Sequence, residues 1–384
     1  MSYVLDVSCL DAYSSGAKQR FINLYSELIK LNKKKNFLII YSKEYQEVKQ
    51  ILDYPNVKFK ENPISQENYL IKLFSIIYIS AFTLFKIKKI KVIEFFTLPF
   101  LRLGQSKNVF TIHDLRKMYF SEFFLNKLAF KFFFSFFLKK VDKIIVVSNA
   151  MKAELQKMFG KLNITTIYNT INVKDFKDVS KKNINLIRYK YKLPKNFILS
   201  VGHLEKRKNY LRLIKSIYIL KKSNYNVNLI IIGQKADETD NIKKLINTLK
   251  LKSNIKVFSN LDDYEVKCFY KIAKLFVFPS LYEGFGIPII ESMAADLPIV
   301  LSNSDVFREI TENKYLYFDQ YDPLSIANKI KFVLENKNLQ KKMILYGRKR
   351  VKYFSLNVQK KKLDKFYNNL IWIIFIKWVF FCIF

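Results

Sequence analysis

The stretch Phe278-Pro-Ser-Leu-Tyr-Glu-Gly-Phe-Gly-Ile-Pro-Ile-Ile-Glu291 lies between an apolar run typical of a strand and a segment typical of a helix. Gly284 and Gly286 permit backbone conformations closed to other residues, and they let backbone amides approach a ligand closely. Pro288 suits the first turn of a helix. The loop and the helix start therefore predict backbone N–H groups at a positive helix end, which is a site for phosphate.

Two carboxylates, Glu283 and Glu291, border this loop. Carboxylates accept hydrogen bonds from sugar hydroxyls, so the pair could hold two sugars, such as a ribose and a hexose. The alternative is a tight turn whose acids cap or solvate the helix. In a glycosidase the two acids must flank one bond, about 5 Å or about 6.5–9.5 Å apart. A phosphate-type loop beside the two acids favours a transferase instead.

Strands and helices are predicted to alternate along nearly the whole chain, which indicates a parallel α/β architecture. In the second half, the predicted strands are 197–201, 228–232, 255–258, 275–278 and 298–301, and the helices are 209–222, 239–249, 263–273 and 288–295. In the first half, the predicted strands are 3–7, 36–41, 91–95, 108–112 and 143–147, with a last strand within 164–171, and the helices are 18–31 and 122–140.

A charged stretch, 173–192, separates the two alternating patterns. We therefore predict two Rossmann-like domains, 1–172 and 173–360, facing across a central cleft, followed by a C-terminal helix and apolar tail, 361–384. Open α/β sheets bind ligands beyond the carboxyl ends of their strands, so the cleft is the expected active site.

The glutamate loop also resembles the donor-site motif of the retaining family 4 glycosyltransferases, the glycosyl transferases group 1, which have the GT-B fold. The resemblance covers most of the chain and extends to a basic motif, an interdomain element and two segments that end the N-terminal domain. These are Val201-Gly-His-Leu-Glu-Lys-Arg-Lys-Asn209, Thr111-Ile-His-Asp-Leu115, Val147-Ser-Asn-Ala-Met-Lys-Ala-Glu-Leu155 and Ile167-Tyr-Asn169.

The resemblance implies roles for individual residues. Glu291 would hold the nucleotide ribose, while Glu283 and His113 would be the catalytic residues near the donor sugar. Arg207 and Lys208 would neutralise the diphosphate leaving group, whose charge grows as the sugar–phosphate bond breaks. The backbone around sugar and phosphate would come from Gly16, Gly284, Phe285, Gly286 and Ile287. The alternatives are a solvated helix start for the two basic residues and a buried structural role for the histidine.

The chain departs from the family pattern at several positions. His203 stands where many relatives have Arg, and Thr170 stands where glycine is common. Asp296 replaces a usual glycine at a position where we expect a left-handed backbone, which Asp tolerates better than most residues. Asp114 is expected to cap a helix. These departures bear on efficiency and donor identity more than on fold.

The function implied by the resemblance is retaining transfer of a sugar from a nucleotide-diphosphate sugar to an acceptor hydroxyl. The expected acceptor is a glycan or a lipid-linked glycan of the cell surface, such as lipopolysaccharide or capsule, and the expected reaction is mannosyltransferase-like. No D-x-D sequence occurs, so we expect no essential divalent metal and no other cofactor. The alternative function is a non-catalytic or nucleic-acid-binding basic α/β protein.

The charge balance bears on partners. Sixty-seven Lys and Arg against 32 Asp and Glu give a net charge of +35, which favours anionic partners such as membrane headgroups. The alternative is that the charge reflects a compositional bias toward Lys, with much of the Lys on the solvated surface. No zinc spacing, RNP-like motif or arginine-rich arm occurs, so nucleic acid is not an expected partner. Three widely separated cysteines and a strand-like N-terminus favour the cytoplasm.

The C-terminal segment 370–384 is apolar apart from Lys377 and contains Trp372 and Trp378. It is shorter than the roughly 20 residues of a membrane span. It could lie in a membrane interface on the inner face of the plasma membrane, pack as a core helix, or extend past the domain, and these three interpretations stay open. Two other apolar stretches, 70–85 and 123–138, are interrupted by lysines and are interpreted as amphipathic core helices.

Overall fold

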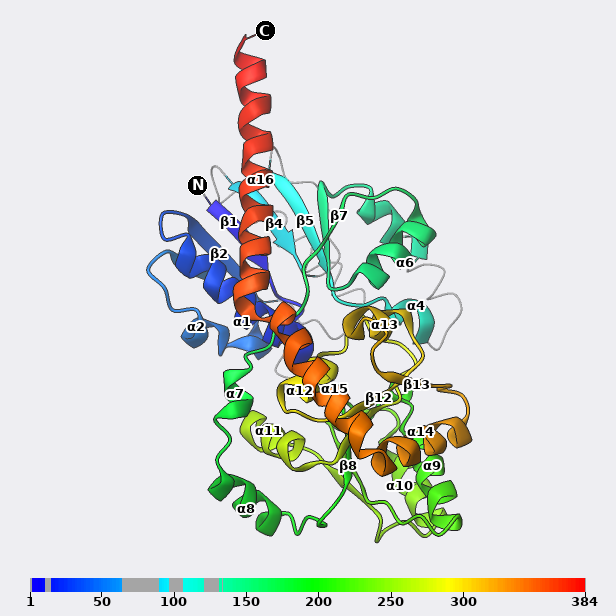
Figure 1. Cartoon of the computed structure of the whole chain (residues 1–384). Helices are drawn as coiled ribbons and strands as arrows, with labels where there is room; N and C mark the ends of the chain where they lie inside the picture. The colour runs from blue at the N-terminus through cyan, green and yellow to red at the C-terminus, as the bar shows by residue number, and fades with distance from the viewer. Residues whose placement is uncertain are drawn as a thin grey trace. The chain divides into compact units, whose positions relative to one another are not determined.

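The computed structural model describes residues 2–10, 15–63, 90–96, 106–120, 131–132 and 134–383, and the side chains of nearly all of these up to residue 370. They form two compact α/β units (Figure 1). Unit 1 comprises Met1–Thr170 together with Leu356–Phe384, and unit 2 comprises Ile171–Ser355. The apolar stretch 70–85 lies outside the described residues, and so do the side chains of the tail beyond residue 370.

The described part of unit 1 contains a parallel sheet in the order β3-β2-β1-β4-β5-β6-β7. Its strands are β1 (Ser2–Asp6), β2 (Asn36–Ser42), β3 (Val57–Asn62), β4 (Ile90–Phe95), β5 (Lys107–Ile112), β6 (Lys143–Val146) and β7 (Ile164–Thr166). Its helices are α1 (Ser15–Leu31), α2 (Val48–Ile51), α4 (Arg116–Phe120), α6 (Asn149–Phe159) and α16 (Leu356–Ile383), with the short η1 (Lys43–Tyr45). The first five predicted strands are confirmed to within one residue, whereas β3 was not predicted.

Helix α16 completes the core of unit 1. Its Leu363 and Tyr367 are buried in the same apolar cluster as Tyr25 of α1. At the rim, Lys360 pairs with Glu27 of α1 at 3.1 Å. The prediction separated 361–384 from both domains, but the structure groups the whole of α16 with unit 1, because its apolar face packs on α1 and the sheet.

A buried carboxylate joins three elements of unit 1. Glu94 of β4 is fully buried and accepts hydrogen bonds from the hydroxyls of Tyr25 and Tyr367. Thr111 of β5 donates a third at 2.5 Å. Burial raises the pKa of Glu94, and the three donors oppose that rise. Since a buried polar group without partners is costly, this cluster fixes α1 and α16 against the sheet.

Unit 2 contains a parallel sheet in the order β10-β9-β8-β11-β12-β13. Its strands are β8 (Ile198–Val201), β9 (Leu229–Ile232), β10 (Ile255–Phe258), β11 (Leu275–Phe278), β12 (Ile299–Ser302) and β13 (Leu316–Phe318). Its helices are α7 (Lys174–Lys177), α8 (Lys181–Lys190), α9 (Tyr210–Lys222), α10 (Thr239–Thr248), α11 (Asp263–Ile272), α12 (Ile287–Ala294), α13 (Asp305–Thr311), α14 (Pro323–Glu335) and α15 (Lys337–Arg350), with the short η2 (Lys206–Lys208) and η3 (Val351–Phe354). Every predicted strand and helix of this half is confirmed to within one residue.

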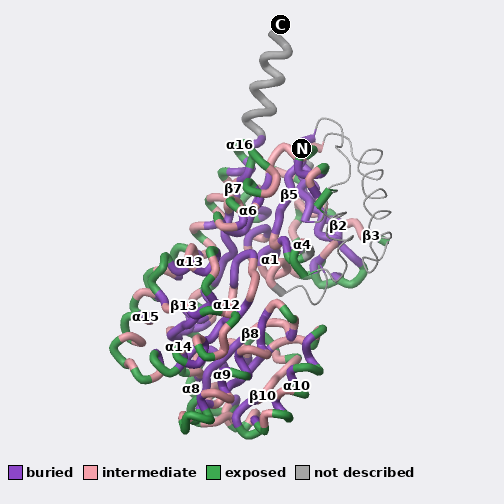
Figure 2. The backbone as a smooth tube through the Cα atoms, turned by 90° about the vertical axis from the view of Figure 1, so that its right-hand side faces the viewer, coloured by how far each residue is buried: buried purple, intermediate pink, exposed green. Residues whose placement is uncertain are grey.

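The strand order of unit 2 reverses between β8 and β11. These neighbours pair through Ile198 and Leu275, with β9 and β10 on one side and β12 and β13 on the other. Figure 2 shows the strands as mostly buried. Since ligands of such sheets bind at the reversal point, beyond the carboxyl ends of the strands, the loops after β8 and β11 mark the candidate site.

Candidate functional site

In the loop after β11, Gly286 has the special backbone conformation that the sequence predicts, whereas Gly284 is not among the glycines of positive φ. Gly286, which precedes α12, has φ +103°, and a Cβ there would come within 3.1 Å of side-chain atoms of both Ile289 and Phe307. A larger residue is therefore excluded by strain and by space. Pro288 lies in the first turn of α12, where its missing N–H costs nothing.

Three of the predicted site residues form one ion-pair cluster. Glu283 lies 2.6 Å from the Nζ of Lys208 and 2.9 Å from a terminal nitrogen of Arg207. The side chains of all three are at most 12% exposed. Burial alone would raise the pKa of Glu283, but Arg207 and Lys208 together lower it to about 2. Glu283 is therefore ionised throughout the physiological range.

Backbone contacts join the basic segment after β8 to the glutamate loop after β11. The N–H of Leu281 donates to the carbonyl of Arg207 at 2.7 Å. The side-chain amide of Asn209, which has φ +60°, donates to the carbonyl of Pro279 at 3.0 Å. A Cβ at Gly202 would lie 2.9 Å from the Lys208 side chain, so this glycine leaves room for the lysine. The two loops therefore form one rigid unit.

A further carboxylate orients the arginine. Glu205 accepts from the Nε of Arg207 at 2.6 Å, and its other oxygen lies 3.5 Å from the Nδ1 of His203. No role was predicted for Glu205, Asn209 or Gly202, although all three lie within the quoted basic motif. The contact of Asn209 with Pro279 depends on the approach of β8 to β11, whereas Glu205 and Gly202 act within the basic segment itself, on Arg207 and Lys208.

Glu291 lies in a different electrostatic environment from Glu283. It is on α12 and accepts a hydrogen bond from the hydroxyl of Tyr270, on α11, at 2.8 Å. Burial raises the pKa of Glu291 to about 7; the Tyr270 hydrogen bond and Lys267 oppose that rise, and Asp263 adds to it. The two glutamates at the loop are therefore one permanent anion and one carboxyl group that titrates near neutrality.

His113 and Gly16 belong to unit 1. His113 follows β5, and its ring stacks on Phe96 with centroids 5.8 Å apart. Burial, together with Arg20, lowers the pKa of His113 to about 3, so the imidazole is neutral at physiological pH. Its Nε2 is buried and has no hydrogen-bond partner among the described residues. Gly16 lies in the first turn of α1. A single site that unites these residues with those of unit 2, and the central cleft itself, stay predictions.

One expectation about a departure from the family pattern is confirmed. Asp296 has φ +62°, in the left-handed region, and its carboxylate accepts two hydrogen bonds from Arg348, at 2.7 and 2.8 Å. Asp114 accepts from the N–H of Arg116, the first residue of α4, at 3.1 Å, so it lies one residue before the N-cap position that was expected for it.

The fold and the site define a two-domain α/β protein in which a basic segment and a glycine loop meet at a strand-order reversal. Residues 183–350 match the family model of the glycosyl transferases group 1. Residues 39–175 match the model of glycosyltransferase family 4. The chain belongs to the group 1/family 4 glycosyltransferases, as its glutamate loop predicted.

Named relatives are enzymes of surface glycan biosynthesis. The chain is 30% identical over 246 residues to the O-antigen chain mannosyltransferase RfbU of Salmonella typhimurium, a match that covers 64% of each chain. It is 29% identical over 257 residues to the capsular polysaccharide biosynthesis glycosyltransferase CapM of Staphylococcus aureus, covering 63% of this chain and 67% of CapM. The match thus spans slightly less than two thirds of RfbU.

Solved structures share the fold over almost the whole chain. The Anabaena protein Alr3699/HepE, in complex with UDP and glucose, superposes with a TM-score of 0.77 at 16% identity, covering 96% of this chain and 100% of the other. A glycosyltransferase from Rickettsia africae gives a TM-score of 0.74 at 20% identity, covering 96% and 98%. These similarities confirm the predicted GT-B fold.

Proposed function

We propose that the chain is a retaining glycosyltransferase that moves a sugar from a nucleoside diphosphate sugar to a hydroxyl of a surface glycan or of its lipid-linked precursor. The proposal rests on the cluster of Arg207, Lys208 and Glu283 beside the glycine loop. Mannosyl transfer is the first reaction to examine, since RfbU is a mannosyltransferase of the O-antigen chain.

In this proposal, the residues of unit 2 and His113 of unit 1 have distinct tasks. Arg207 and Lys208 contact the diphosphate and stabilise the charge that develops as the glycosidic oxygen leaves. Glu283 fixes both cations and accepts from hydroxyls of the transferred sugar, because its carboxylate stays ionised. Glu291 accepts from the ribose. His113, as a neutral imidazole, can exchange a hydrogen bond with the sugar without adding charge.

Positive side chains take the place of a metal in this scheme, so we propose that transfer needs no divalent cation. A thermal-shift panel of nucleotide sugars identifies the donor, which at a hundred times its Kd adds about 2.7 kcal/mol of stability. We expect the bound donor to be turned over at the same initial rate in excess EDTA. Failure of every nucleotide sugar to bind would overturn the proposed function. Loss of turnover in EDTA, restored by magnesium or manganese, would overturn the metal-free scheme alone.

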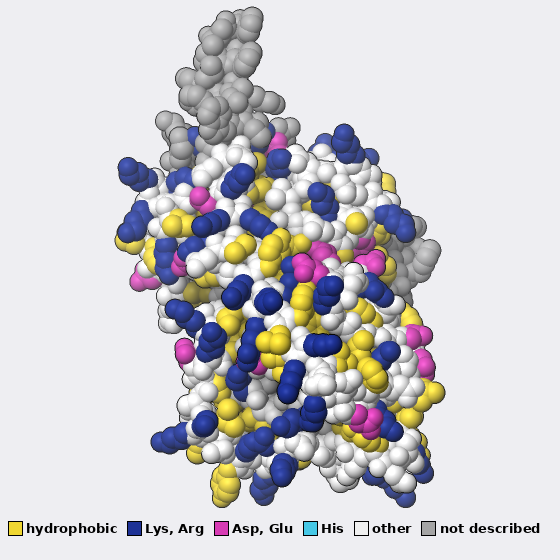
Figure 3. Space-filling view, viewed as in Figure 1, with side chains coloured by type: hydrophobic (Ala, Val, Ile, Leu, Met, Phe, Trp, Pro, Cys, Tyr) yellow, Lys and Arg dark blue, Asp and Glu magenta, His cyan; other side chains and the backbone are white. Residues whose placement is uncertain are grey.

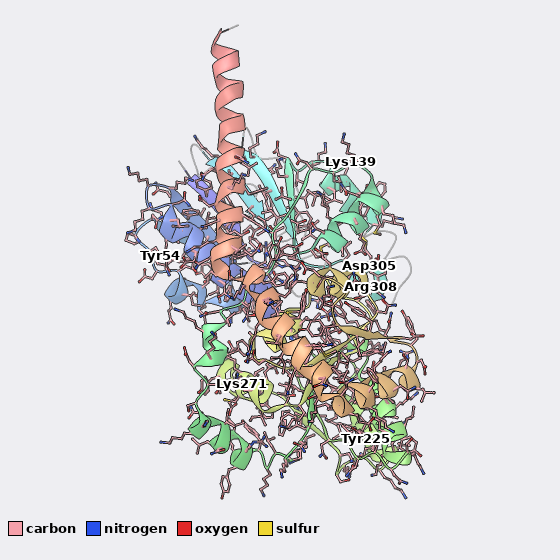
Figure 4. The ribbon with its side chains drawn as sticks, in the orientation of Figure 1. Tyr54, Lys139, Tyr225, Lys271, Asp305 and Arg308 are labelled. Carbon is pink, nitrogen blue, oxygen red and sulfur yellow. The ribbon has the colours of Figure 1, made fainter. Side chains whose placement is uncertain are left out.

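We also propose peripheral binding to an anionic membrane surface on the cytoplasmic side. Lys and Arg are spread over the visible face (Figure 3). In the helical residues 134–138, Phe134 and Phe137 are buried and Phe136 is 51% exposed; Phe132, one turn earlier, is 72% exposed. The Nζ of Lys140 lies 5.3 Å from the centroid of the Phe136 ring. The preceding residue, Lys139, is labelled in Figure 4. Among the described residues, no helix has the length and apolarity needed to cross a membrane.

Co-sedimentation with liposomes tests the membrane proposal. Each basic residue near an anionic surface contributes about 1 kcal/mol, so binding should require anionic lipid and fall as salt rises. The pair Phe132→Ser and Phe136→Ser should weaken binding severalfold, as should removal of residues 372–384. The matched pair Leu324→Ser and Phe332→Ser, at exposed positions of unit 2, should not. Equal recovery on neutral and anionic liposomes would count against this proposal.

A further inference from the structure

Tyr270 is held rigidly with its hydroxyl on Glu291. It is 1% exposed, and its hydroxyl donates to Oε2 of Glu291 at 2.8 Å. Its ring lies between Phe176 of α7 and Phe276 of β11, with centroids 6.0 and 5.6 Å away. A buried tyrosine has only two side-chain torsions to fix, and these two rings fix them. The position of the hydroxyl is therefore set by the core of unit 2.

A second contact joins the same turn of α11 to α12. The Nζ of Lys271, labelled on α11 in Figure 4, donates to the carbonyl of Ala295 at 3.4 Å. This contact holds the C-terminal end of α12 near α11 without touching Glu291. Separate substitutions can thus remove the Lys271 contact between the two helices and the hydrogen bond to Glu291.

The two oxygens of the Glu291 carboxylate have different environments. Oε2 accepts a hydrogen bond from Tyr270, whereas none of the described residues donates one to Oε1. A carboxylate oxygen can accept more than one hydrogen bond, so Oε1 has full capacity for a hydroxyl. We infer that Tyr270 is a positioning residue for donor binding, which fixes the carboxylate of Glu291 through Oε2 and aims Oε1 at a ribose hydroxyl of a nucleoside diphosphate sugar. This inference deepens the proposed function and rests on it.

The charged groups near Glu291 leave its ionisation sensitive to the Tyr270 hydrogen bond. Two charged side chains of α11 bear on the carboxyl group: Asp263 raises its pKa and Lys267 lowers it. Lys267 also pairs with Asp175 of α7 at 3.1 Å, so part of its positive charge is balanced by a carboxylate other than Glu291. Burial outweighs both and brings the pKa to about 7, with the Tyr270 hydrogen bond as the largest opposing influence. Without the hydroxyl, the protonated form predominates at neutral pH, and a protonated carboxyl is a weaker acceptor.

The test is Tyr270→Phe, which removes only the hydroxyl. Donor affinity is measured by calorimetry from about pH 6 to about pH 9 with the nucleotide sugar found in the panel, whose diphosphate diester does not titrate in that range. We expect affinity about fivefold below the parent at pH 7, because loss of the hydroxyl lowers the ionised fraction of Glu291 from the half that a pKa of about 7 gives to about one tenth. At about pH 9, where Glu291 is ionised again, the deficit should shrink to about threefold or less.

Two control variants separate positioning from packing. Lys271→Met removes the other contact of this turn, and Tyr315→Phe removes a buried tyrosine hydroxyl elsewhere in unit 2, which donates to the carbonyl of Met343 at 3.0 Å. Both should keep the parent's pH profile. The inference is overturned if Tyr270→Phe follows the parent at every pH, or if Lys271→Met weakens binding as much as Tyr270→Phe does. A parent that binds no nucleotide sugar would instead overturn the proposed function.

Discussion

Glu283→Gln is expected to lower sugar transfer by at least about a hundredfold while leaving the affinity for the free nucleoside diphosphate undiminished, because it removes an interaction made with the reacting sugar. In the structure, two cations, Arg207 and Lys208, are balanced by two carboxylates, Glu205 and Glu283. Neutralising Glu283 leaves the cluster with a net positive charge. An anionic diphosphate should then bind at least as tightly as before, although the fixed carboxylate at the sugar is lost. Calorimetry with the nucleoside diphosphate and initial rates with the donor measure the two effects separately.

The same substitution should destabilise unit 2. The pKa of Glu283 is lowered from an ordinary 4.5 to about 2 by Arg207 and Lys208, so its ionised form stabilises the fold. That contribution is fully present above about pH 4.5 and is lost as pH falls through about 2. A shift of this size corresponds to about 3 kcal/mol, similar to the cost of breaking a buried ion pair. Urea unfolding near neutral pH should show this loss, and the difference between parent and variant should narrow on acidification.

A second carboxylate provides the control for destabilisation. Glu265 lies 2.6 Å from Lys190 and is largely buried, but it belongs to the capping box of α11, and its side-chain partners are Lys190 and Tyr191. Glu265→Gln should lower stability and leave turnover of the folded protein near that of the parent. If Glu283→Gln abolished nucleoside diphosphate binding, the assignment of Glu283 to the sugar would be wrong. If it left turnover unchanged, the donor site itself would lie elsewhere.

The strands and helices of unit 2 were predictable because their signals are local. Apolar runs bounded by glycine, proline or polar residues give β9, β11 and β12 directly, and β8 and β10 are such runs with one polar residue each, Ser200 and Lys256. Strand β3, Val57-Lys-Phe-Lys-Glu-Asn62, was missed because only two of its six residues, Val57 and Phe59, are apolar, which is too short a pattern to predict a strand. Its strand conformation comes from pairing with β2, which is a tertiary contact.

The candidate site was predictable in its members but not in its connections. The glycine loop and the glutamates follow from the sequence, yet Arg207 and Lys208 were expected as cations for phosphate alone. The structure pairs both with Glu283, a residue about 75 positions away, and a contact at that separation has no local signal. The link from Tyr270 to Glu291 escaped prediction for the same reason, since it depends on how α11 and α12 pack.

Glu291→Ala should weaken binding of the donor and of the free nucleoside diphosphate alike, by roughly ten- to a hundredfold. Both ligands contain the ribose, and losing a charged hydrogen-bond acceptor costs about 1.5–3 kcal/mol. Because burial raises the pKa of Glu291 to about 7, the effect should be largest above that pH, where the parent is ionised, and should shrink toward about pH 6. In stability the sign is reversed from Glu283: the raised pKa means that ionisation of Glu291 costs folding free energy as pH rises from its ordinary value through about 7.

The role of Glu291 is decided by comparing the loss of affinity for the donor with the loss of affinity for the free nucleoside diphosphate. If the ribose is its ligand, donor and free nucleotide lose affinity by the same factor, and turnover at saturating donor falls much less than for Glu283→Gln. The isosteric Glu291→Gln keeps the shape of the side chain and should lose affinity without the pH dependence, because Gln does not titrate. Measurements with the free nucleotide are made at about pH 8, where its terminal phosphate is fully ionised, so that only Glu291 differs. A variant that bound the nucleotide like the parent at this pH would show that the ribose is held elsewhere, and a loss confined to the donor would move Glu291 to the transferred sugar.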